Sequence, residues 1–324
     1  MGLKRRPSRP AAASTNSVTQ KVNKANTTTA VTSSPSTSVF GQSVTFTATV
    51  TATAPGAGTP TGTVTFTDQA SGAALGTGTL DSSGKATFST SSLSAGTHTI
   101  VATYAGDNNF NSSFSSSTNS ASQTVNKANS ATAVTSSAGT SAFGQSVTFT
   151  ATVTATGPGA GTPTGTVTFT DQASGAALGT GTLDSSGKAT FSTSNLAVGT
   201  HTIVASYAGD NNFNSSTNSL SQTVNKASTT TALTSSANPS TSGQSVTFTA
   251  QTAVTAPGAG TPTGTVTFTD QTSGTTLGSG TVDSTGKATL STAALAKGSH
   301  HIVAMYGGDM DFATSMGAVD QTVN

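Results

Sequence analysis

Residues 41–50 read GQSVTFTATV, and the alternation of side chains in this stretch decides the fold. Val44, Phe46, Ala48 and Val50 would lie on one face of an extended chain, while the hydroxyl residues between them would lie on the other. This period of two is typical of a β-strand with one buried face and one solvated face.

Six further segments around residues 41–50 have strand character. Residues 63–67 alternate in the same way, and in the segment SLSAGTHTIVATYAG the side chains of Ile100, Ala102 and Tyr104 share one face. Pro and Gly punctuate the loop between the second and third strands, and DSSG suits a hairpin turn in which Gly84 adopts a positive φ. The segments are 27–32, 63–67, 73–80, 85–90, one within 92–106, and 120–125.

The same strands recur along the chain. GQSVTFTA begins at Gly41, Gly144 and Gly243, and the offsets between copies are 103 and 99 residues because the first copy carries an extra FSSS at 114–117. A period near 100 residues exceeds that of solenoid repeats but matches one self-sufficient β-sandwich. The sequence therefore predicts an all-β chain of three tandem antiparallel sandwiches of about seven strands each, covering 24–126, 127–225 and 226–324.

The segment before the first repeat differs from the rest. Four basic residues lie within its first ten positions, and TNSVTQKVNKAN from Thr15 resembles TNSLSQTVNKAS from Thr217. We therefore expect residues 1–23 to be a disordered basic N-terminus that ends in the last strand of a preceding repeat of a longer parent chain. No apolar core of signal-peptide length follows the basic residues, and no apolar run is long enough to insert into a membrane.

Composition excludes several classes of function. Charged residues make up 7% of the chain, Glu is absent, and beyond the first ten residues eight lysines face eleven aspartates. Without a basic face, nucleic-acid binding is not expected. Cys is absent, which rules out disulfides, thiolate metal sites and cysteine nucleophiles. Aromatic residues total 5%, and most of them alternate inward, which argues against an aromatic binding face.

Several blocks occurring in the same order carry a family resemblance. FGQSVTFTATV, PTGTVTFTD, LGTGTLDSSGKATFSTSSL and AGTHTIVATYAGDNNFNSS together resemble the bacterial immunoglobulin-like (Ig-like) domain repeats of the group 3 type. The third copy departs from the pattern, because Ser242 stands where Phe40 and Phe143 stand, and GDMDFATS replaces GDNNFNSS. The resemblance implies the fold, the tandem arrangement and an extracellular or cell-surface setting, but no shared ligand site.

His98, His201 and His300 occupy equivalent positions in the three copies. In immunoglobulin domains a tyrosine at this corner bonds back to the backbone through its hydroxyl, and a histidine ring nitrogen could make the same bond. Catalysis or metal binding would require partners that converge on each ring. Since the residue is copied in every repeat, we interpret it as a structural corner and assign no catalytic or cofactor-binding residue.

Oxygen-bearing side chains cluster after the corner strand of the first two repeats. Such loops can bind Ca²⁺, yet no Glu stands at the twelfth position of a calcium loop and there is no obligatory Gly. The simpler interpretation is that these residues cap a turn by bonding the local backbone. The weak Ca²⁺ candidates are Asp107, Asn109, Asn111, Asp210, Asn212 and Asn214.

These observations predict a non-enzymatic structural spacer or stalk of a bacterial cell-surface or secreted protein, with a role in adhesion or display. The short VNKA links predict that neighbouring sandwiches align end to end. A second interpretation stays open, in which the chain is a carbohydrate- or protein-binding accessory module of a larger exported enzyme. The expected partners are neighbouring Ig-like repeats and an unidentified surface glycan or protein.

Overall fold

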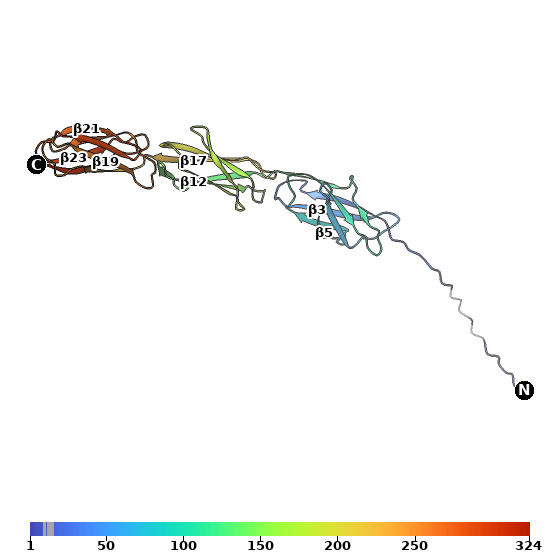
Figure 1. Cartoon of the computed structure of the whole chain (residues 1–324). Helices are drawn as coiled ribbons and strands as arrows, with labels where there is room; N and C mark the ends of the chain where they lie inside the picture. The colour runs from blue at the N-terminus through green and yellow to red at the C-terminus, as the bar shows by residue number, and fades with distance from the viewer. Residues whose placement is uncertain (9–10, 12–15) are drawn as a thin grey trace. The chain divides into compact units, whose positions relative to one another are not determined.

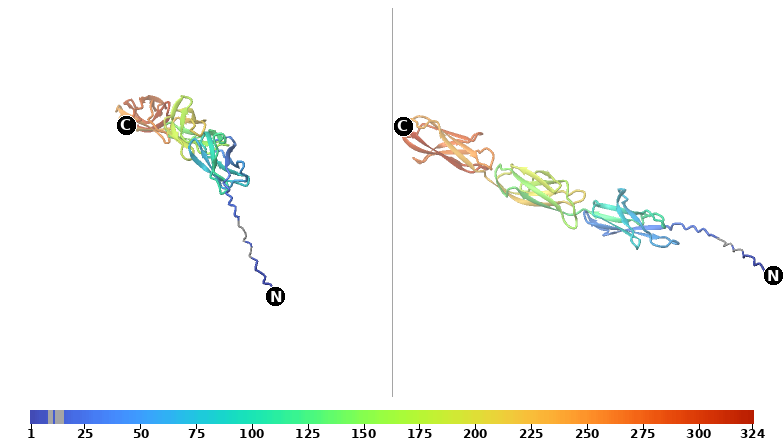
Figure 2. Two further views of the ribbon diagram at one scale, coloured as in Figure 1. Left: turned by 90° about the vertical axis from the view of Figure 1, so that its right-hand side faces the viewer. Right: turned by 90° about the horizontal axis from the view of Figure 1, so that it is seen from below.

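The computed structural model describes residues 1–8, 11 and 16–324 (Figure 1). All regular structure in these residues is β-strand, and none of them forms an α-helix. In this described part, therefore, no helix is long and apolar enough to cross a membrane. Figure 2 shows from two further sides that each repeat is built from strands and loops alone.

The first repeat places its strands in two sheets. One sheet has the order β1–β3–β6. The other has the order β2–β9–β7–β4–β5, with β8 also paired to β7. The strands are β1 (Thr27–Ser34), β2 (Thr37–Val39), β3 (Val44–Ala52), β4 (Thr63–Asp68), β5 (Ala73–Thr79), β6 (Lys85–Thr90), β7 (Gly96–Tyr104), β8 (Ser113–Phe114) and β9 (Ala121–Asn126).

The second repeat has the same arrangement. Its sheets have the orders β10–β12–β15 and β11–β17–β16–β13–β14. The strands are β10 (Ser130–Ser136), β11 (Thr140–Ala142), β12 (Val147–Ala155), β13 (Thr166–Asp171), β14 (Ala176–Thr182), β15 (Lys188–Thr193), β16 (Gly199–Tyr207) and β17 (Ser216–Asn225).

The third repeat follows the same plan without a separate short second strand. Its sheets have the orders β18–β19–β22 and β21–β20–β23–β24. The strands are β18 (Thr229–Ser235), β19 (Val246–Val254), β20 (Thr265–Asp270), β21 (Thr275–Thr281), β22 (Lys287–Thr292), β23 (Gly298–Tyr306) and β24 (Ser315–Val323).

The core of each repeat forms where the inward faces of the two sheets meet. In the second repeat Phe149 of β12 and Phe169 of β13 have no exposed surface, and their ring centroids are 6.5 Å apart across the two sheets. Such burial stabilises a fold by roughly 1.5–3 kcal/mol for each large apolar side chain. The alternation in strand β3, where every second residue is buried, confirms the predicted two-residue period.

The structure confirms the all-β fold, the three repeats and the seven predicted strands of each. It adds short strands that the sequence does not signal, because segments of two or three residues are too short to show alternation. One of these also corrects the expected antiparallel pairing, because β11 pairs with β17 in parallel. The predicted turn conformation is present, with φ of 73° at Gly84.

The described residues form two compact units. The first comprises residues 1–38, 43–91 and 96–125, and the second comprises 39–42, 92–95 and 126–324. Residues 16–23 are exposed and lie in no strand, although the sequence predicted part of a strand there. The other part of that N-terminal prediction, at 9–10 and 12–15, lies outside the described residues, and the proposed limits of the repeats stay a prediction.

Candidate functional site

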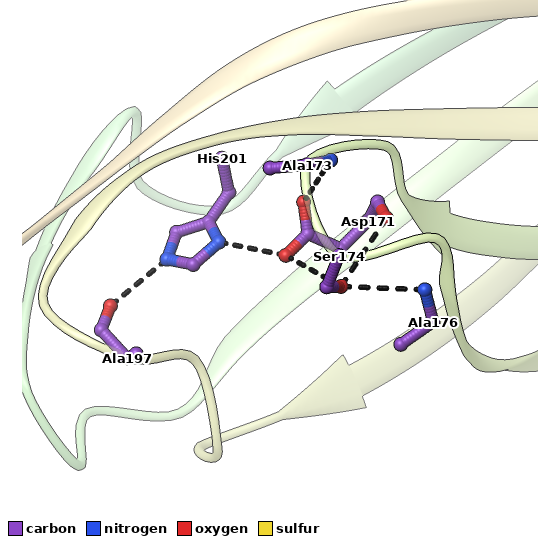
Figure 3. A network of polar contacts seen from close by, with 6 residues as sticks. All are labelled: Asp171, Ala173, Ser174, Ala176, Ala197 and His201. Atoms are coloured by element: carbon purple, nitrogen blue, oxygen red, sulfur yellow. Dashed lines mark hydrogen bonds and ion pairs between the residues drawn. The ribbon is translucent and has the colours of Figure 1, made fainter.

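The histidine of each repeat lies inside a polar cluster at the edge of the core. In the second repeat β16 turns His201 inward, and its Nδ1 lies 2.9 Å from Oδ2 of Asp171, the last residue of β13 (Figure 3). Its Nε2 lies 2.9 Å from the backbone oxygen of Ala197. Two acceptors therefore flank one ring, and only the protonated imidazolium can donate to both of them.

The carboxylate of Asp171 is held by further donors from the turn that follows β13. The Ala173 amide donates to Oδ1 at 3.2 Å, and the Ser174 hydroxyl donates to Oδ2 at 3.3 Å. The Ser174 hydroxyl in turn accepts the Ala176 amide at 3.3 Å, as Figure 3 shows. The acid thus joins the corner histidine to the β13–β14 turn in one network.

Both partners are shifted toward their charged forms. Burial lowers the pKa of His201, but hydrogen bonds to the Ala197 carbonyl and to Asp171 outweigh it and raise that pKa above 6.5. Burial likewise opposes ionisation of Asp171, yet hydrogen bonds from His201 and from the Ala173 amide hold its pKa below 3.8. At mildly acidic pH, His201 and Asp171 are therefore both charged and form an ion pair.

The same pair recurs in the other repeats. His98 Nδ1 lies 2.9 Å from Asp68, and His300 Nδ1 lies 2.8 Å from Asp270. In the third repeat His300 Nε2 also lies 2.7 Å from the Ala296 oxygen, which is the ring-to-backbone bond considered from the sequence. The assignment of these histidines as structural corners is supported by this geometry and stays a proposal.

The aspartate of each pair was not among the site residues predicted from the sequence. Alternation in TVTFTD places Asp68 on the same face as Val64 and Phe66, so an inward acid at the end of that strand was readable. The structure confirms that position, because Asp68 is 5% exposed. A buried acid requires a partner, which could have directed attention to the equally inward His98.

The pair is poorly arranged for acid–base catalysis in the second and third repeats. A histidine that acts as a general base must present one ring nitrogen to the substrate while the other is oriented by an acid. In His201 and His300 one nitrogen faces the acid and the other faces a backbone carbonyl. Among the described residues, no three His, Cys, Asp or Glu side chains gather in a way that could hold a metal ion.

The first Ca²⁺ candidate, Asp107, accepts hydrogen bonds through both carboxylate oxygens. Oδ1 accepts the amides of Asn109 and Phe110 at 2.7 and 2.8 Å, and Oδ2 accepts the Thr61 amide and hydroxyl at 2.9 and 2.7 Å. Burial opposes ionisation, but these bonds hold the pKa of Asp107 well below its usual range. Asn111 donates from Nδ2 to the Asn26 side chain at 2.8 Å.

The second repeat copies this turn. Asp210 accepts the amides of Asn212 and Phe213 at 2.7 and 2.8 Å and the Thr164 amide at 2.8 Å, and Asn214 donates to Asn129. The geometry supports the turn-capping interpretation for Asp107 and Asp210, and it remains the proposal for them. The side chains of Asn111 and Asn214 instead bond residues far away in the sequence, and Oδ1 of Asn212 accepts the Ala95 amide at 3.1 Å.

A fully buried glutamine forms a second polar site that sequence analysis did not single out. Gln222 of β17 has no exposed surface, and its Oε1 accepts the Ser136 hydroxyl at 2.8 Å. Its Nε2 donates to the Ser141 hydroxyl at 3.2 Å. The amide thus connects the β10–β11 segment to β17, and Gln321 makes the corresponding bonds to Ser235 and Ser240.

The chain passes between the second and third repeats without a free linker. Only three residues separate β17 from β18, and the middle one, Ala227, is fully buried and forms a parallel bridge with Phe312. Its amide donates to the Asp311 oxygen at 2.8 Å, and its oxygen accepts the Ala313 amide at 2.9 Å. The link is therefore part of the next sandwich.

These sheets, corners and links define a tandem protein of Ig-like β-sandwiches. The bacterial Ig-like domain (group 3) family matches the chain at residues 31–126, 134–225 and 233–324, and the chain belongs to that family. The matched segments end where the predicted repeats end but begin later than 24, 127 and 226, so the limits of the repeats stay a prediction.

Comparison with solved structures gives only distant likenesses. FdeC, an Escherichia coli adhesin, is 17% identical with a TM-score of 0.30, covering 91% of this chain and 96% of its own. The Yersinia pseudotuberculosis adhesin InvE is 18% identical with a TM-score of 0.35, covering 66% and 68%. Titin domains A168–A170 are 12% identical with a TM-score of 0.31, covering 88% and 95%. None of the curated proteins compared matches the chain.

Proposed function

We propose that this chain is a non-catalytic spacer or stalk of a bacterial cell-surface or secreted protein, which serves adhesion or display. The observation that carries the proposal is where the chain enters and leaves a sandwich. In the third repeat the chain enters beside Phe312 and bonds Thr229 to Ser315, which lies opposite Tyr306 at one end of β23. It leaves after Val323, which lies opposite Gly298 at the other end.

Entry and exit at opposite ends make each sandwich a unit of length. Strand β23 has nine residues, and at about 3.3 Å for each residue it spans about 30 Å. The second repeat has the same layout, since Ala128 bridges Phe213 on entry and Val224 lies opposite Gly199 on exit. Such a chain gains distance with each repeat. Low charge suits a spacer better than a binding face, and so does the exposure of only one aromatic ring, Phe114, among the described residues.

A display experiment tests the spacer role. The chain would be placed between a membrane anchor and an epitope tag on a cell surface, and tag height would be measured by energy transfer to a membrane dye. Deleting residues 127–225 joins Asn126 to Lys226 and keeps the VNKA link intact. We expect the tag to move toward the membrane by about 30–40 Å, one sandwich length; an unchanged height would contradict the proposal.

The accessory-module alternative is separated by a binding screen. Purified chain would be applied to glycan and surface-protein arrays at micromolar concentration. The spacer proposal predicts no selective binding. Selective, saturable binding to one class of glycan would instead favour the module of a larger exported enzyme.

Protease treatment of intact cells of the source organism tests the proposed extracellular location, which requires cleavage of the chain without lysis.

A further inference from the structure

A phenylalanine closes the junction between the second and third repeats. Phe143, directly after β11, meets Phe312 edge to face, with ring centroids 5.5 Å apart and an interplanar angle of 82°. The Phe143 oxygen accepts the Ala259 amide at 3.2 Å. A Cβ on the following Gly144 would lie 2.3 Å from the Ala259 oxygen, so the glycine is needed for this approach.

The second compact unit contains the same contact once more. Phe40 meets Phe213 edge to face at 5.3 Å and 79°, and its oxygen accepts the Ala160 amide at 3.2 Å. A Cβ on Gly161 would lie 3.0 Å from the Phe40 ring, so this glycine lies directly against the ring. We call the residues that receive the phenylalanine its seat. The phenylalanine that packs on a neighbouring repeat and the seat that receives it thus recur as a matched pair.

At the equivalent position of the third repeat the sequence has Ser242 instead of phenylalanine. The following Gly243 keeps a φ of 80°, but a Cβ there would meet nothing within 4 Å. This end of the chain therefore has the turn of the junction but lacks its aromatic ring.

The first repeat has the residues that would receive such a phenylalanine. Phe110, Ala57 and Gly58 are the counterparts of Phe213, Ala160 and Gly161 by the offset of 103 residues. Beside them lies a hollow of about 370 Å³, whose lining includes Val22, Lys24, Gly56, Ala57 and Phe110. Phe110 is 6% exposed, against 1% for Phe213 under its aromatic partner.

The segment that leads into this hollow points to what fills it. Val18 and Val22 are 88% and 87% exposed. Their counterparts in the matching segment of the second repeat are Leu220, which packs on the core, and Val224, which is 3% exposed. Residues 16–23 therefore have the side chains of a core strand and no sheet to join among the described residues.

We infer that the hollow at Phe110 is a socket for the phenylalanine of another group 3 Ig-like repeat in the same polypeptide, with residues 16–23 as the last strand of that repeat. A second copy of the chain is a poorer occupant. Its Phe40 and Phe143 are already seated, and Ser242 has no ring to offer.

An extended chain tests the socket. Residues 1–23 would be replaced by a copy of residues 127–225, so that Asn225 of the copy precedes Lys24 as it precedes Lys226 in the natural junction. A matched version carries Phe143→Ser in the copy, which reproduces the side chain found at Ser242. We expect the Ala57 amide to exchange with solvent about fivefold to tenfold more slowly in the phenylalanine version.

Two controls decide between outcomes. In the natural chain, Phe143→Ser should speed exchange of the Ala259 amide by a similar factor; no change there would remove the basis of the inference. If Ala259 responds but Ala57 exchanges equally in both extended versions, the hollow is not a socket for this ring. Sedimentation of the unextended chain at about 100 μM should show a monomer, and head-to-tail oligomers would assign the hollow to a second copy and overturn the inference.

Discussion

At the residue scale, adjacent histidines of β23 offer a direct comparison of a buried and an exposed acid–base pair. His300 points inward to Asp270, and these side chains are 10% and 3% exposed. His301 points outward to Asp320, with side chains 47% and 79% exposed. The distances are similar, at 2.8 and 2.6 Å, but the inner pair is buried and has further partners. The Ser273 hydroxyl also donates to Asp270, and His300 Nε2 lies 2.7 Å from the Ala296 oxygen.

We expect Asp270→Asn to destabilise the third repeat and Asp320→Asn to leave it almost unchanged. Asn keeps one acceptor oxygen, but its NH₂ group cannot accept the bonds that Ser273 and His300 make to Oδ2 of Asp270, and the negative charge is lost. Leaving such buried groups without their partner costs about 1–3 kcal/mol. An exposed pair is screened by solvent and contributes less than about 1 kcal/mol. Amide hydrogen exchange of β23 measures both effects, and equal destabilisation by the two substitutions would show that burial of the pair is irrelevant.

The buried pairs also predict a pH dependence. The pKa of His300 is raised above 6.5, so its contribution is complete below that pH and is lost as the pH rises through the raised value. The pKa of Asp270 is lowered below 3.8, so its contribution is complete above that pH and is lost as the pH falls through the lowered value. The His300–Asp270 pair therefore stabilises the fold most between pH 3.8 and pH 6.5.

NMR titration of the imidazole rings checks this directly. His300 and His201 should titrate above 6.5 in the folded chain, and Asp270→Asn should lower the pKa of His300 without altering that of His201. Titration of both rings at or below 6.5 in the natural chain would refute the ion-pair assignment.

At the element scale, glycines in the equivalent strands β5, β14 and β21 allow the two sheets of each repeat to approach at one edge. A Cβ on Gly181 of β14 would lie 2.6 Å from the backbone oxygen of Thr190 in β15. A Cβ on Gly179 would lie 2.2 Å from the Phe191 ring. The segment LGTGTL predicts the strand. The need for glycine within it cannot be predicted from that segment, because it arises from the close approach of β15 in the other sheet.

We expect Gly181→Ala to destabilise the second repeat by about 1–3 kcal/mol, since the new methyl group would have to displace backbone atoms of β15. Gly139→Ala is the matched control, because a Cβ there would meet nothing within 4 Å. Urea denaturation of both variants is the measurement. Similar midpoints for the two would mean that the sheets have room to separate at this edge.

The contrast between what alternation predicts and what it misses is clearest within single strands. The strand at 44–50 can be predicted because its side chains alternate between the core and the more exposed face. Strand β2 and the seat of Phe143 could not be found in that way, because both depend on residues about 90 or 170 positions away in the sequence. The buried aspartates lie between these cases: their face was predictable, but their histidine partners were set by the β4–β7 pairing and its equivalents.

At the scale of the whole molecule, three repeats with separate cores should behave as three mechanical units. The second and third repeats each have their own cluster of buried side chains, and only Phe143 packs against both. Neighbouring cores thus share little apolar surface, so loss of one sandwich should leave the next one folded. Independent closure of each sandwich is the central claim on which the spacer role depends.

Pulling single molecules from both ends tests that claim most directly. Unfolding a repeat of about 99 residues should release about 300 Å of chain, at about 3.4 Å for each residue less the folded length. We predict three separate force peaks with this spacing before the chain is fully extended. A single release of the whole length, or a smooth extension without peaks, would contradict the existence of three independently closed sandwiches.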